Sequence, residues 1–334
     1  MSMLNSVQAQ LRIMPLGNSI TYDNSTLDGL PPSPTRPLNE RIAYRKKLYE
    51  LLTNAGYNFD FVGSENAGSA LLADSENAGF PGIEAGDLRK LLTTGKIVQN
   101  NPFLYNKNDQ VTTGPYLDAY NPNVILLHIG TNNVANTPAS VMGQIFDEIE
   151  AYAIRSGIKV TVFMALIIKE SPNNPKTQVF NNGIKLIANA VNSDHIKVIV
   201  VDMENGAGIN YATEMVDQWH PNNIGYEKMA QLWFEKLSDN MAILGNDEDL
   251  AYANEVKVFP NPTESDFTIV IDNSNWRKFE VSISDISGKV FKPIALVHNR
   301  NNKINVSLQG FPSGQYFIRL VSDKDSIVKK IFKN

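Results

Sequence analysis

The sequence predicts an α/β domain with a parallel sheet, followed by a small antiparallel β-sandwich. Three observations support this prediction. Continuous apolar runs alternate with amphipathic stretches across residues 11–244, which is typical of a parallel sheet covered by helices on both faces. Residues 245–254 are acidic and rich in turn formers, as expected of a linker. Residues 255–334 then change to short runs with two-residue alternation, the pattern of antiparallel strands.

The first domain alternates strand-like and helix-like segments. The apolar runs, expected to be strands, cover residues 11–16, 59–62, 124–128, 160–168 and 196–202. The amphipathic stretches, expected to be helices, cover residues 39–55, 85–92, 137–156, 177–192 and 222–244. Thr137 followed by Pro138 favours a helix start, because the hydroxyl caps the helix and proline suits its first turn. Residues 30–37 are rich in proline and predict an irregular loop.

Four polar motifs accompany the strands of this domain. They are Gly17-Asn-Ser19, Gly79-Phe-Pro-Gly82, Gly130-Thr-Asn-Asn133 and Asp217-Gln-Trp-His220, in that order. Ligands of open parallel sheets bind at the carboxyl ends of the strands. Three of the four motifs directly follow a strand or its loop, so we expect them to gather on one edge of the sheet.

The motifs hold the groups that acyl transfer needs. Ser19 follows the first strand, where a turn presents its hydroxyl as a nucleophile. His220 is a candidate base, and Asp217, three residues earlier, is placed to orient its ring. Gly82 and Asn132 are candidate donors to an oxyanion, through a backbone N–H and a side-chain amide. Taken alone, each motif is better explained by turn geometry or chance spacing.

Together, the four motifs resemble those of the SGNH (GDSL-type) hydrolases over about 230 residues. Ala43 to Leu52 and Phe59 to Ser64 look more narrowly like the acetyl xylan esterases of carbohydrate esterase family 3. The resemblance implies a flavodoxin-like three-layer α/β/α fold and a serine esterase that needs no metal or other cofactor. It also implies that Ser19 is the nucleophile and an oxyanion donor.

The same resemblance implies the remaining roles. Gly82 and Asn132 would complete the oxyanion hole, His220 would be the base, and Asp217 its orienting carboxylate.

The sequence departs from the family pattern near the site. Asn18 replaces the usual aspartate before the serine, Asn133 replaces a common aspartate, and Phe80 stands where histidine is frequent. Asparagine has nearly the shape of aspartate, so activity is expected to survive. These three residues, together with Tyr22 and Trp219, are candidate substrate contacts. For Trp219, packing is the alternative.

The second domain carries a different resemblance. Val258-Phe-Pro-Asn-Pro262, Ile286-Ser-Gly-Lys-Val290, the segment 308–316 and Lys329-Lys330 look like the type IX secretion sorting domain. The resemblance implies an immunoglobulin-like sandwich. It also implies the type IX machinery as partner and export through the periplasm of a Gram-negative bacterium to the surface or outside. Strands are expected at residues 256–259, 267–271, 279–286, 304–308, 315–321 and 327–332.

The alternative for this domain is a carbohydrate-binding sandwich. The aromatic residues Phe267, Phe279 and Phe317 fit a core better than a sugar-stacking face.

Composition excludes several classes of protein. The chain has no cysteine, so thiol catalysis and disulfides are excluded. A net charge of −5 disfavours nucleic acid or an anionic membrane as partner, and no apolar run approaches the roughly 20 residues of a membrane span. Residues 1–10 are polar and end like a signal peptide, but lack its charged start and apolar stretch. They are interpreted as the remnant of an export signal or as a plain tail.

The leading hypothesis is a secreted esterase that removes O-acetyl groups from a polysaccharide by a two-step serine mechanism. The first alternative keeps the mechanism and changes the substrate to a lipid ester, thioester or aryl ester. The second is a non-catalytic surface protein that binds polysaccharide on an esterase fold, which only Asn18 favours. The polysaccharide, the ester position and the oligomeric state are not specified by the sequence.

Overall fold

The computed structural model describes residues 10–29, 35–98, 104–132, 134–170, 174–240, 256–271, 278–285, 290–298, 303–322 and 326–334. The chain divides into two compact units, residues 1–245 and 246–334, which are described separately below. The predicted linker and residues 1–9 of the predicted tail lie outside the described residues, as do residues 30–34 of the proline-rich loop.

The first unit is built on a parallel sheet. Its main strands are β1 (Leu11–Gly17), β2 (Phe59–Phe61), β4 (Val124–His128), β5 (Val160–Ala165) and β6 (Ile196–Val201). They lie in the order β2-β1-β4-β5-β6, and the two-residue strand β3 (Ala78–Gly79) pairs with the end of β1 beyond β2. This is the flavodoxin-like order, with the first strand inserted between its neighbours. The predicted flavodoxin-like sheet is therefore confirmed.

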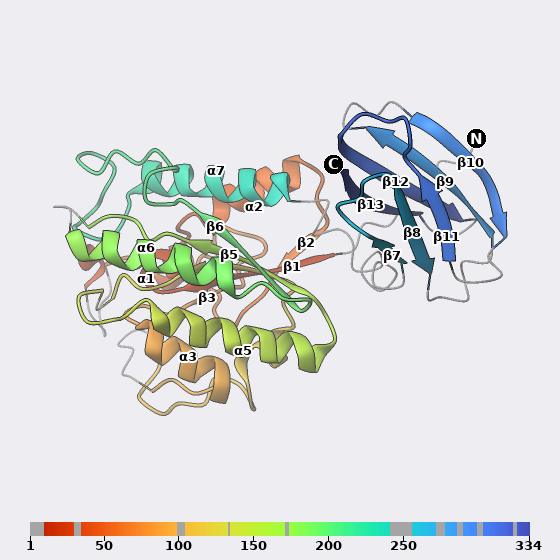
Figure 1. Ribbon diagram of the computed structural model, residues 1–334. Helices are drawn as coiled ribbons and strands as arrows, with labels where there is room; N and C mark the ends of the chain where they lie inside the picture. Colours follow the sequence, from red (N-terminus) through yellow and green to blue (C-terminus); the bar gives the residue numbers. More distant parts are fainter. Residues whose placement is uncertain are drawn as a thin grey trace. The chain divides into compact units, whose positions relative to one another are not determined.

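Helices cover both faces of this sheet (Figure 1). On one face lie α2 (Arg45–Asn54) and α7 (Asn223–Asp239), whose buried side chains share a core cluster. On the other face lie α3 (Ala85–Thr94), α5 (Ser140–Ser156) and α6 (Pro175–Ala190), with the short α4 (Tyr116–Tyr120). The result is the predicted three-layer α/β/α arrangement.

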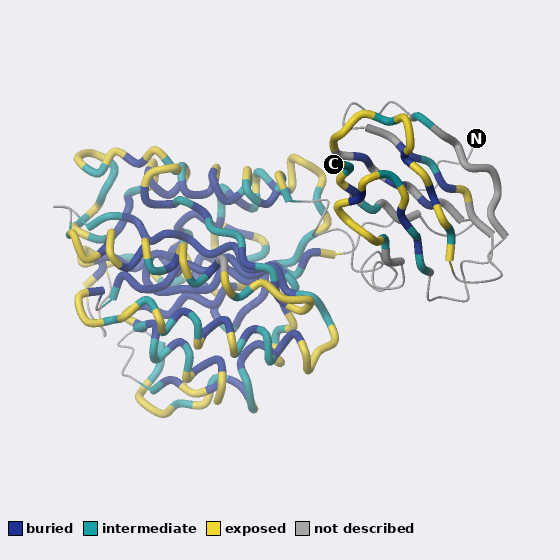
Figure 2. The backbone as a smooth tube through the Cα atoms, viewed as in Figure 1, coloured by how far each residue is buried: buried dark blue, intermediate teal, exposed yellow. Residues whose placement is uncertain are grey.

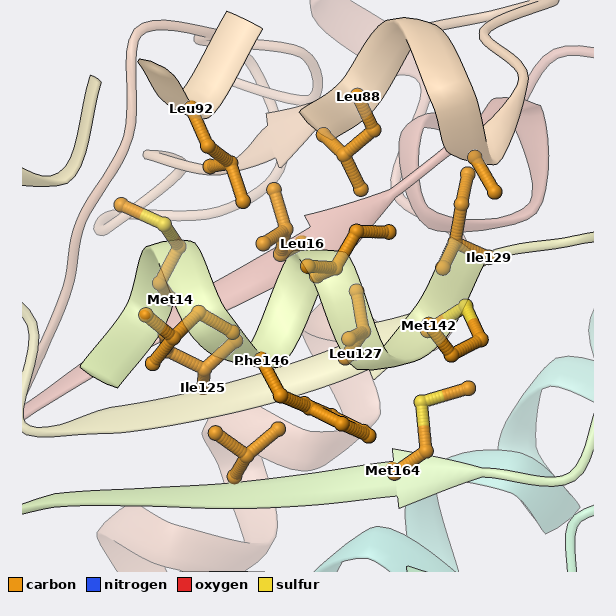
Figure 3. Close-up of a cluster of buried hydrophobic side chains, with 14 of the residues drawn as sticks. Met14, Leu16, Leu88, Leu92, Ile125, Leu127, Ile129, Met142, Phe146 and Met164 are labelled. Carbon is orange, nitrogen blue, oxygen red and sulfur yellow. The ribbon is translucent and has the colours of Figure 1, made fainter. Parts of the chain in front are cut away.

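Side chains on the two faces of each strand pack into two different cores. In β1, Leu11 and Ile13 belong to the core with α2 and α7, whereas Met14 and Leu16 belong to the opposite core. Figure 3 shows Met14 and Leu16 packed with leucines, isoleucines and Phe146 from neighbouring elements. The central part of the sheet is largely buried (Figure 2), and every residue of β4 and β5 is buried. Burying one such side chain stabilises the fold by about 2 kcal/mol, so the sheet is a rigid base for the loops at its edge.

Several element boundaries differ from the predictions for identifiable reasons. β5 ends at Ala165 rather than 168. Leu166 N still donates to the Val201 carbonyl, but Ile167 N donates to the Asn181 side chain and Ile168 N to the His128 side chain. The helix expected from residue 39 begins only at Arg45, after Ala43 adopts a left-handed φ of +47°.

Two helices also begin at other residues than predicted. α5 begins at Ser140 after an Ala139 cap that makes no side-chain bond, so Thr137 does not cap it. α6 begins at Pro175, capped by the Asn174 side chain, two residues before the predicted start at Thr177.

The second unit contains two antiparallel sheets. One has the order β10-β9-β12-β13 and the other β11-β8-β7. Phe267 and Ile269 of β8 form one core cluster with Val281, Ile283 and residues of β12, so the two sheets pack face to face. The strands are β7 (Val256–Phe259), β8 (Asp266–Ile271), β9 (Lys278–Asp285), β10 (Val290–His298), β11 (Lys303–Ser307), β12 (Gly314–Ser322) and β13 (Ser326–Lys333).

The predicted β-sandwich is confirmed, but the sequence pattern missed one strand. β10 contains Pro293, and proline interrupts the strand signal because it cannot donate to a ladder. β10 lies at the edge of its sheet, where proline is tolerated, and its pairing with β9 contains register shifts. Phe267 is buried at 2% exposure, as expected of a core residue, whereas the side chains of Phe279 and Phe317 lie outside the described part of the structure.

The fully buried His128 at the end of β4 makes the stability of this unit sensitive to acid. Its Nε2 accepts a hydrogen bond from Ile168 N at 3.4 Å, and burial lowers the pKa of His128 to about 4. An unfolded histidine has a pKa of about 6.5, so the unfolded chain binds the proton first. The stabilisation is therefore complete above pH 6.5 and is lost as the pH falls from 6.5 towards 4.

We expect wild type to lose about 2 kcal/mol of unfolding free energy between pH 7 and pH 4.5 through this residue. The His128→Gln variant keeps an acceptor for Ile168 N but does not titrate, so it should lose that much less over the same interval. Urea denaturation of both proteins at the two pH values measures the difference. Equal losses would show that His128 is not protonated on unfolding.

Candidate active site

The nucleophile candidate is positioned by the end of β1. Asn18 ends the strand run and caps the short helix α1 (Ser19–Tyr22), with its Oδ1 accepting from Ile20 N at 3.0 Å. Ser19 is the first residue of this helix and is 8% exposed. A Cβ on Gly17 would lie 2.5 Å from both the His128 carbonyl and Thr21 Oγ1, so only glycine allows this tight exit from the sheet.

A second loop brings Asp217 and His220 to Ser19. His220 Nε2 lies 2.9 Å from Ser19 Oγ, and His220 Nδ1 lies 2.8 Å from Asp217 Oδ1. The loop is closed by a hydrogen bond from Val216 N to the His220 carbonyl at 2.8 Å, with a bridge between Met215 and Pro221. The structure therefore brings the three predicted residues into one continuous hydrogen-bonded chain.

Asp217 is held by five donors. Besides the His220 ring, its Oδ1 accepts from the backbone N–H groups of Trp219 and His220, at 2.8 and 2.9 Å. Its Oδ2 accepts from Thr26 N at 2.8 Å and from Thr26 Oγ1 at 2.6 Å. Burial raises the pKa of Asp217, but the hydrogen bonds from His220 and Thr26 outweigh it and hold this pKa well below its ordinary value.

This charge state fixes the roles of the histidine nitrogens. An ionised carboxylate only accepts hydrogen bonds, so His220 Nδ1 must carry the proton that points to Asp217. With Nδ1 as the protonated nitrogen of a neutral ring, Nε2 is free to accept a hydrogen bond from Ser19 Oγ. The arrangement is suited to removing the proton from the serine hydroxyl.

The two oxyanion-donor candidates lie beside the same cavity. Pro81 and Gly82 form a turn closed by Ile83 N donating to the Phe80 carbonyl at 3.1 Å, and Gly82 has the left-handed φ of +82° that favours glycine. Asn132 Nδ2 donates to the Ile83 carbonyl at 2.9 Å, which fixes the amide orientation. A cavity of about 430 Å³ is lined by Ser19, Asn24, Ser25, Thr26, Gly29, Pro81, Gly82, Asn132, Trp219 and His220.

Three of the candidate substrate contacts are corrected by the structure. Asn18 is fully buried as the cap of α1, Tyr22 is 2% exposed, and Phe80 is fully buried in the core. None of these three lines the cavity, because all three are buried in the packed interior. Trp219 does line it, while Asn133 lies outside the described residues.

Sequence reasoning missed the segment that forms one wall of the site. Asn24, Ser25, Thr26 and Gly29 line the cavity, and Thr26 bonds to a carboxylate 191 residues away in sequence. A run of polar residues after Ser19 was the available signal, but nothing local links it to Asp217.

This wall is fixed by buried charges. Asp28 accepts from Arg36 Nε at 2.6 Å and Arg36 Nη2 at 2.7 Å, and Arg36 also pairs with Asp23 at 3.0 Å. Burial raises the pKa of Asp28, but the Arg36 hydrogen bond and other contacts outweigh it and lower this pKa overall. The fully buried Arg41 donates to the side-chain oxygen of Asn24 and to the Arg36 carbonyl. These pairs hold the wall in one conformation.

The described part of the chain holds neither a metal-binding cluster nor a membrane-spanning helix. No group of three or more His, Asp or Glu side chains there is arranged to hold a metal ion. Among the same residues, none of the helices is both long and apolar enough to cross a membrane.

The comparisons with known proteins show the family to which this chain belongs. Residues 13–233 match the GDSL-like lipase/acylhydrolase family, and the chain belongs to that family.

Individual relatives agree with this assignment. A multidomain esterase of Ruminococcus flavefaciens is 30% identical over 251 residues, which cover 70% of this chain but only 29% of that protein. Two solved structures are similar in fold, each with a TM-score of 0.50. A family 3 carbohydrate esterase of Clostridium thermocellum is 24% identical over 71% of this chain and all of its own. A carbohydrate esterase family 3 protein of Talaromyces cellulolyticus is 21% identical over 70% of this chain and 99% of its own.

The second unit has its own match. Residues 257–334 match the secretion system C-terminal sorting domain. This match indicates type IX secretion to the cell surface or the extracellular space.

Proposed function

We propose that this protein is a secreted serine esterase that removes O-acetyl groups from a polysaccharide. The observation that carries the proposal is the chain from Ser19 Oγ through His220 to Asp217, with contacts of 2.9 and 2.8 Å, at the wall of a small cavity. A nucleophile, a base and an orienting carboxylate in this order form the arrangement that acyl transfer requires.

The first half of the reaction forms an acyl-enzyme. Ser19 Oγ attacks the ester carbonyl carbon while His220 Nε2 takes the hydroxyl proton, and the carbonyl oxygen becomes an oxyanion. We assign the Ser19 N–H, the Gly82 N–H and the Asn132 amide as its donors. When the intermediate collapses, the bond to the alcohol oxygen breaks, and His220 returns its proton to that oxygen. The alcohol leaves and the acetyl group stays on Ser19.

The second half releases acetate. Water loses a proton to His220 Nε2 and attacks the acetyl carbonyl, which gives a second oxyanion in the same position. Collapse breaks the bond to Ser19 Oγ, which takes the proton back from His220. Asp217 remains ionised throughout and stabilises the imidazolium that forms in each half.

The cavity favours a small acyl group on a neutral alcohol. Its volume of about 430 Å³ is shared between the acyl group and the alcohol, and none of its lining residues carries a carboxylate or a fixed positive charge. Trp219 offers an aromatic ring beside His220, which suits contact with a sugar. The names of the similar carbohydrate esterases motivate the choice of a polysaccharide.

We further propose that residues 11–244 are the catalytic domain, 245–254 a linker and 255–334 the sorting domain that engages the type IX machinery. This machinery belongs to Gram-negative bacteria, so the esterase would act outside such a cell. The match to the sorting domain over residues 257–334 supports this assignment.

Acetate release from acetylated xylan, measured beside hydrolysis of 4-nitrophenyl esters of two to twelve carbons, tests the proposal. We expect release from xylan and a kcat/KM that falls by about tenfold or more from acetate to butyrate or beyond, because a small pocket excludes longer chains. Hydrolysis of long-chain esters or thioesters alone would favour a lipase or thioesterase. Binding to xylan without hydrolysis of any ester would favour a non-catalytic protein that binds polysaccharide on an esterase fold.

A further inference from the structure

The cavity contains a hydrogen-bond donor that the proposed chemistry does not use. Asn24 lines the cavity next to Ser19, and its backbone N–H donates to the Ser19 carbonyl at 2.9 Å. Only 8% of the residue is exposed, so its side chain is held in the wall rather than free in solvent.

The orientation of the Asn24 amide follows from its partner. Arg41 is fully buried and donates to Asn24 Oδ1. A guanidinium has no acceptor, so the amide oxygen must face Arg41 and the NH₂ group must face away from it. Arg41 itself is fixed by its bond to the Arg36 carbonyl at 3.0 Å and by Asp28 at 3.7 Å.

The NH₂ group is open to the cavity. No acceptor for Asn24 Nδ2 occurs among the residues that the structure describes. Asn18 Nδ2, by contrast, is sealed from solvent without a partner, and Asn24 Nδ2 is not among the atoms sealed in this way. Since the little exposed surface of Asn24 borders the cavity, the amide presents its N–H groups there.

The acceptors that the substrate offers determine which of its atoms could bind these N–H groups. An acetyl group has one strong acceptor, the carbonyl oxygen, and the proposed oxyanion donors already serve it. Another donor in the cavity therefore needs an oxygen of the alcohol part. The hydroxyl and ring oxygens of a neutral sugar supply such acceptors, and an aryl or alkyl alcohol without further oxygens does not.

We propose that Asn24 is a specificity-determining residue that donates a hydrogen bond to a sugar oxygen of the ester substrate. This inference rests on the proposed esterase function. Arg41 and the ion pairs behind it set the angle of the donor, so that a sugar entering the cavity meets a fixed N–H group. A fixed donor discriminates more strongly than a mobile one because little side-chain entropy is lost on binding.

The experiment compares Asn24→Asp with wild type on two substrates. The carboxylate keeps an acceptor for Arg41, so the wall is retained, but it has no N–H to offer and repels sugar oxygens. We expect kcat/KM on acetylated xylan to fall by about tenfold or more, mainly through KM, as expected for a lost substrate hydrogen bond. Activity on 4-nitrophenyl acetate, which has no sugar oxygens, should fall clearly less than activity on acetylated xylan, because only the added charge acts on it.

Two further variants complete the design. Asn24→Ala removes the donor without adding charge and should show the same selective loss. Asn210→Asp adds the same charge on an exposed turn outside the cavity, where an aspartate keeps the side-chain bond to Ala212 N, and should leave both activities unchanged. Thermal melting of each variant separates loss of substrate binding from loss of fold.

The outcomes separate this inference from the proposed function. Equal losses on both substrates, or no loss on either, would overturn the role of Asn24 and leave the esterase intact. Wild-type hydrolysis of 4-nitrophenyl acetate without release from any acetylated sugar would also overturn it. An absence of Ser19-dependent hydrolysis of every ester would overturn the proposed function, and the role of Asn24 with it.

Discussion

The Ser19→Ala variant is expected to hydrolyse 4-nitrophenyl acetate with a kcat about 10⁴- to 10⁶-fold below wild type, and His220→Ala should lose a similar factor. The reason is geometric. Ser19 Oγ and His220 Nε2 lie 2.9 Å apart, so in the proposed mechanism the serine supplies the attacking oxygen and the histidine nitrogen in contact with it takes its proton. Steady-state kinetics on the full chain measures both losses.

The double variant sharpens this test. If the two residues act as one unit, removing both should cost about as much as removing either alone, whereas independent contributions would multiply. Ser69→Ala and His195→Ala change the same residue types at exposed positions and should retain full activity. Substantial activity in Ser19→Ala would show that another group is the nucleophile.

Asn132→Ala is expected to lower kcat by about 10²- to 10³-fold while KM changes little, because an oxyanion donor acts mainly in the transition state. The Asn132 amide is fixed by its 2.9 Å bond to the Ile83 carbonyl, which leaves the second N–H of the amide for the oxyanion. Kinetics on 4-nitrophenyl acetate separates kcat from KM.

Asn132→Asp is the informative companion of this variant. It keeps the size of the side chain but turns a negative charge towards the developing oxyanion, so kcat should fall further than in Asn132→Ala. A rise in KM with unchanged kcat in Asn132→Ala would instead mean that the amide binds the substrate in the ground state.

The fold of the first unit was largely predictable because its strands are buried on both faces and therefore read as continuous apolar runs. Val124 to His128 was predicted to the residue. Short elements were not predicted: β3 has two residues, and α4 has five, too few for either period to show. In the second unit, β10 was not predicted because Pro293 interrupts its strand pattern.

The candidate site was likewise predicted in part. Ser19, Asp217 and His220 were identified from motifs whose residues stand near strand ends, and the structure brings them within hydrogen-bond distance. Tyr22 and Phe80 were placed in the cavity wrongly, because proximity in sequence to Ser19 or Gly82 does not reveal whether a side chain faces the cavity or the core. Thr26 was missed because its partner is distant in sequence.

The position of β1 in the sheet has a consequence for how activity arises. β1 pairs in parallel with β2 on one side and with β4 on the other. The residues of β4 lie more than a hundred positions after those of β1. Ser19 stands directly after β1, but its partner His220 follows the last strand of the sheet, 201 residues further along the chain. Pairings this distant in sequence close late, because the entropy of the intervening loop must be overcome first. If the proposed mechanism holds, ester hydrolysis would therefore report completion of the whole sheet. A ribosome-bound chain that has not yet formed its last strand would already carry Ser19 but would lack the histidine that activates it.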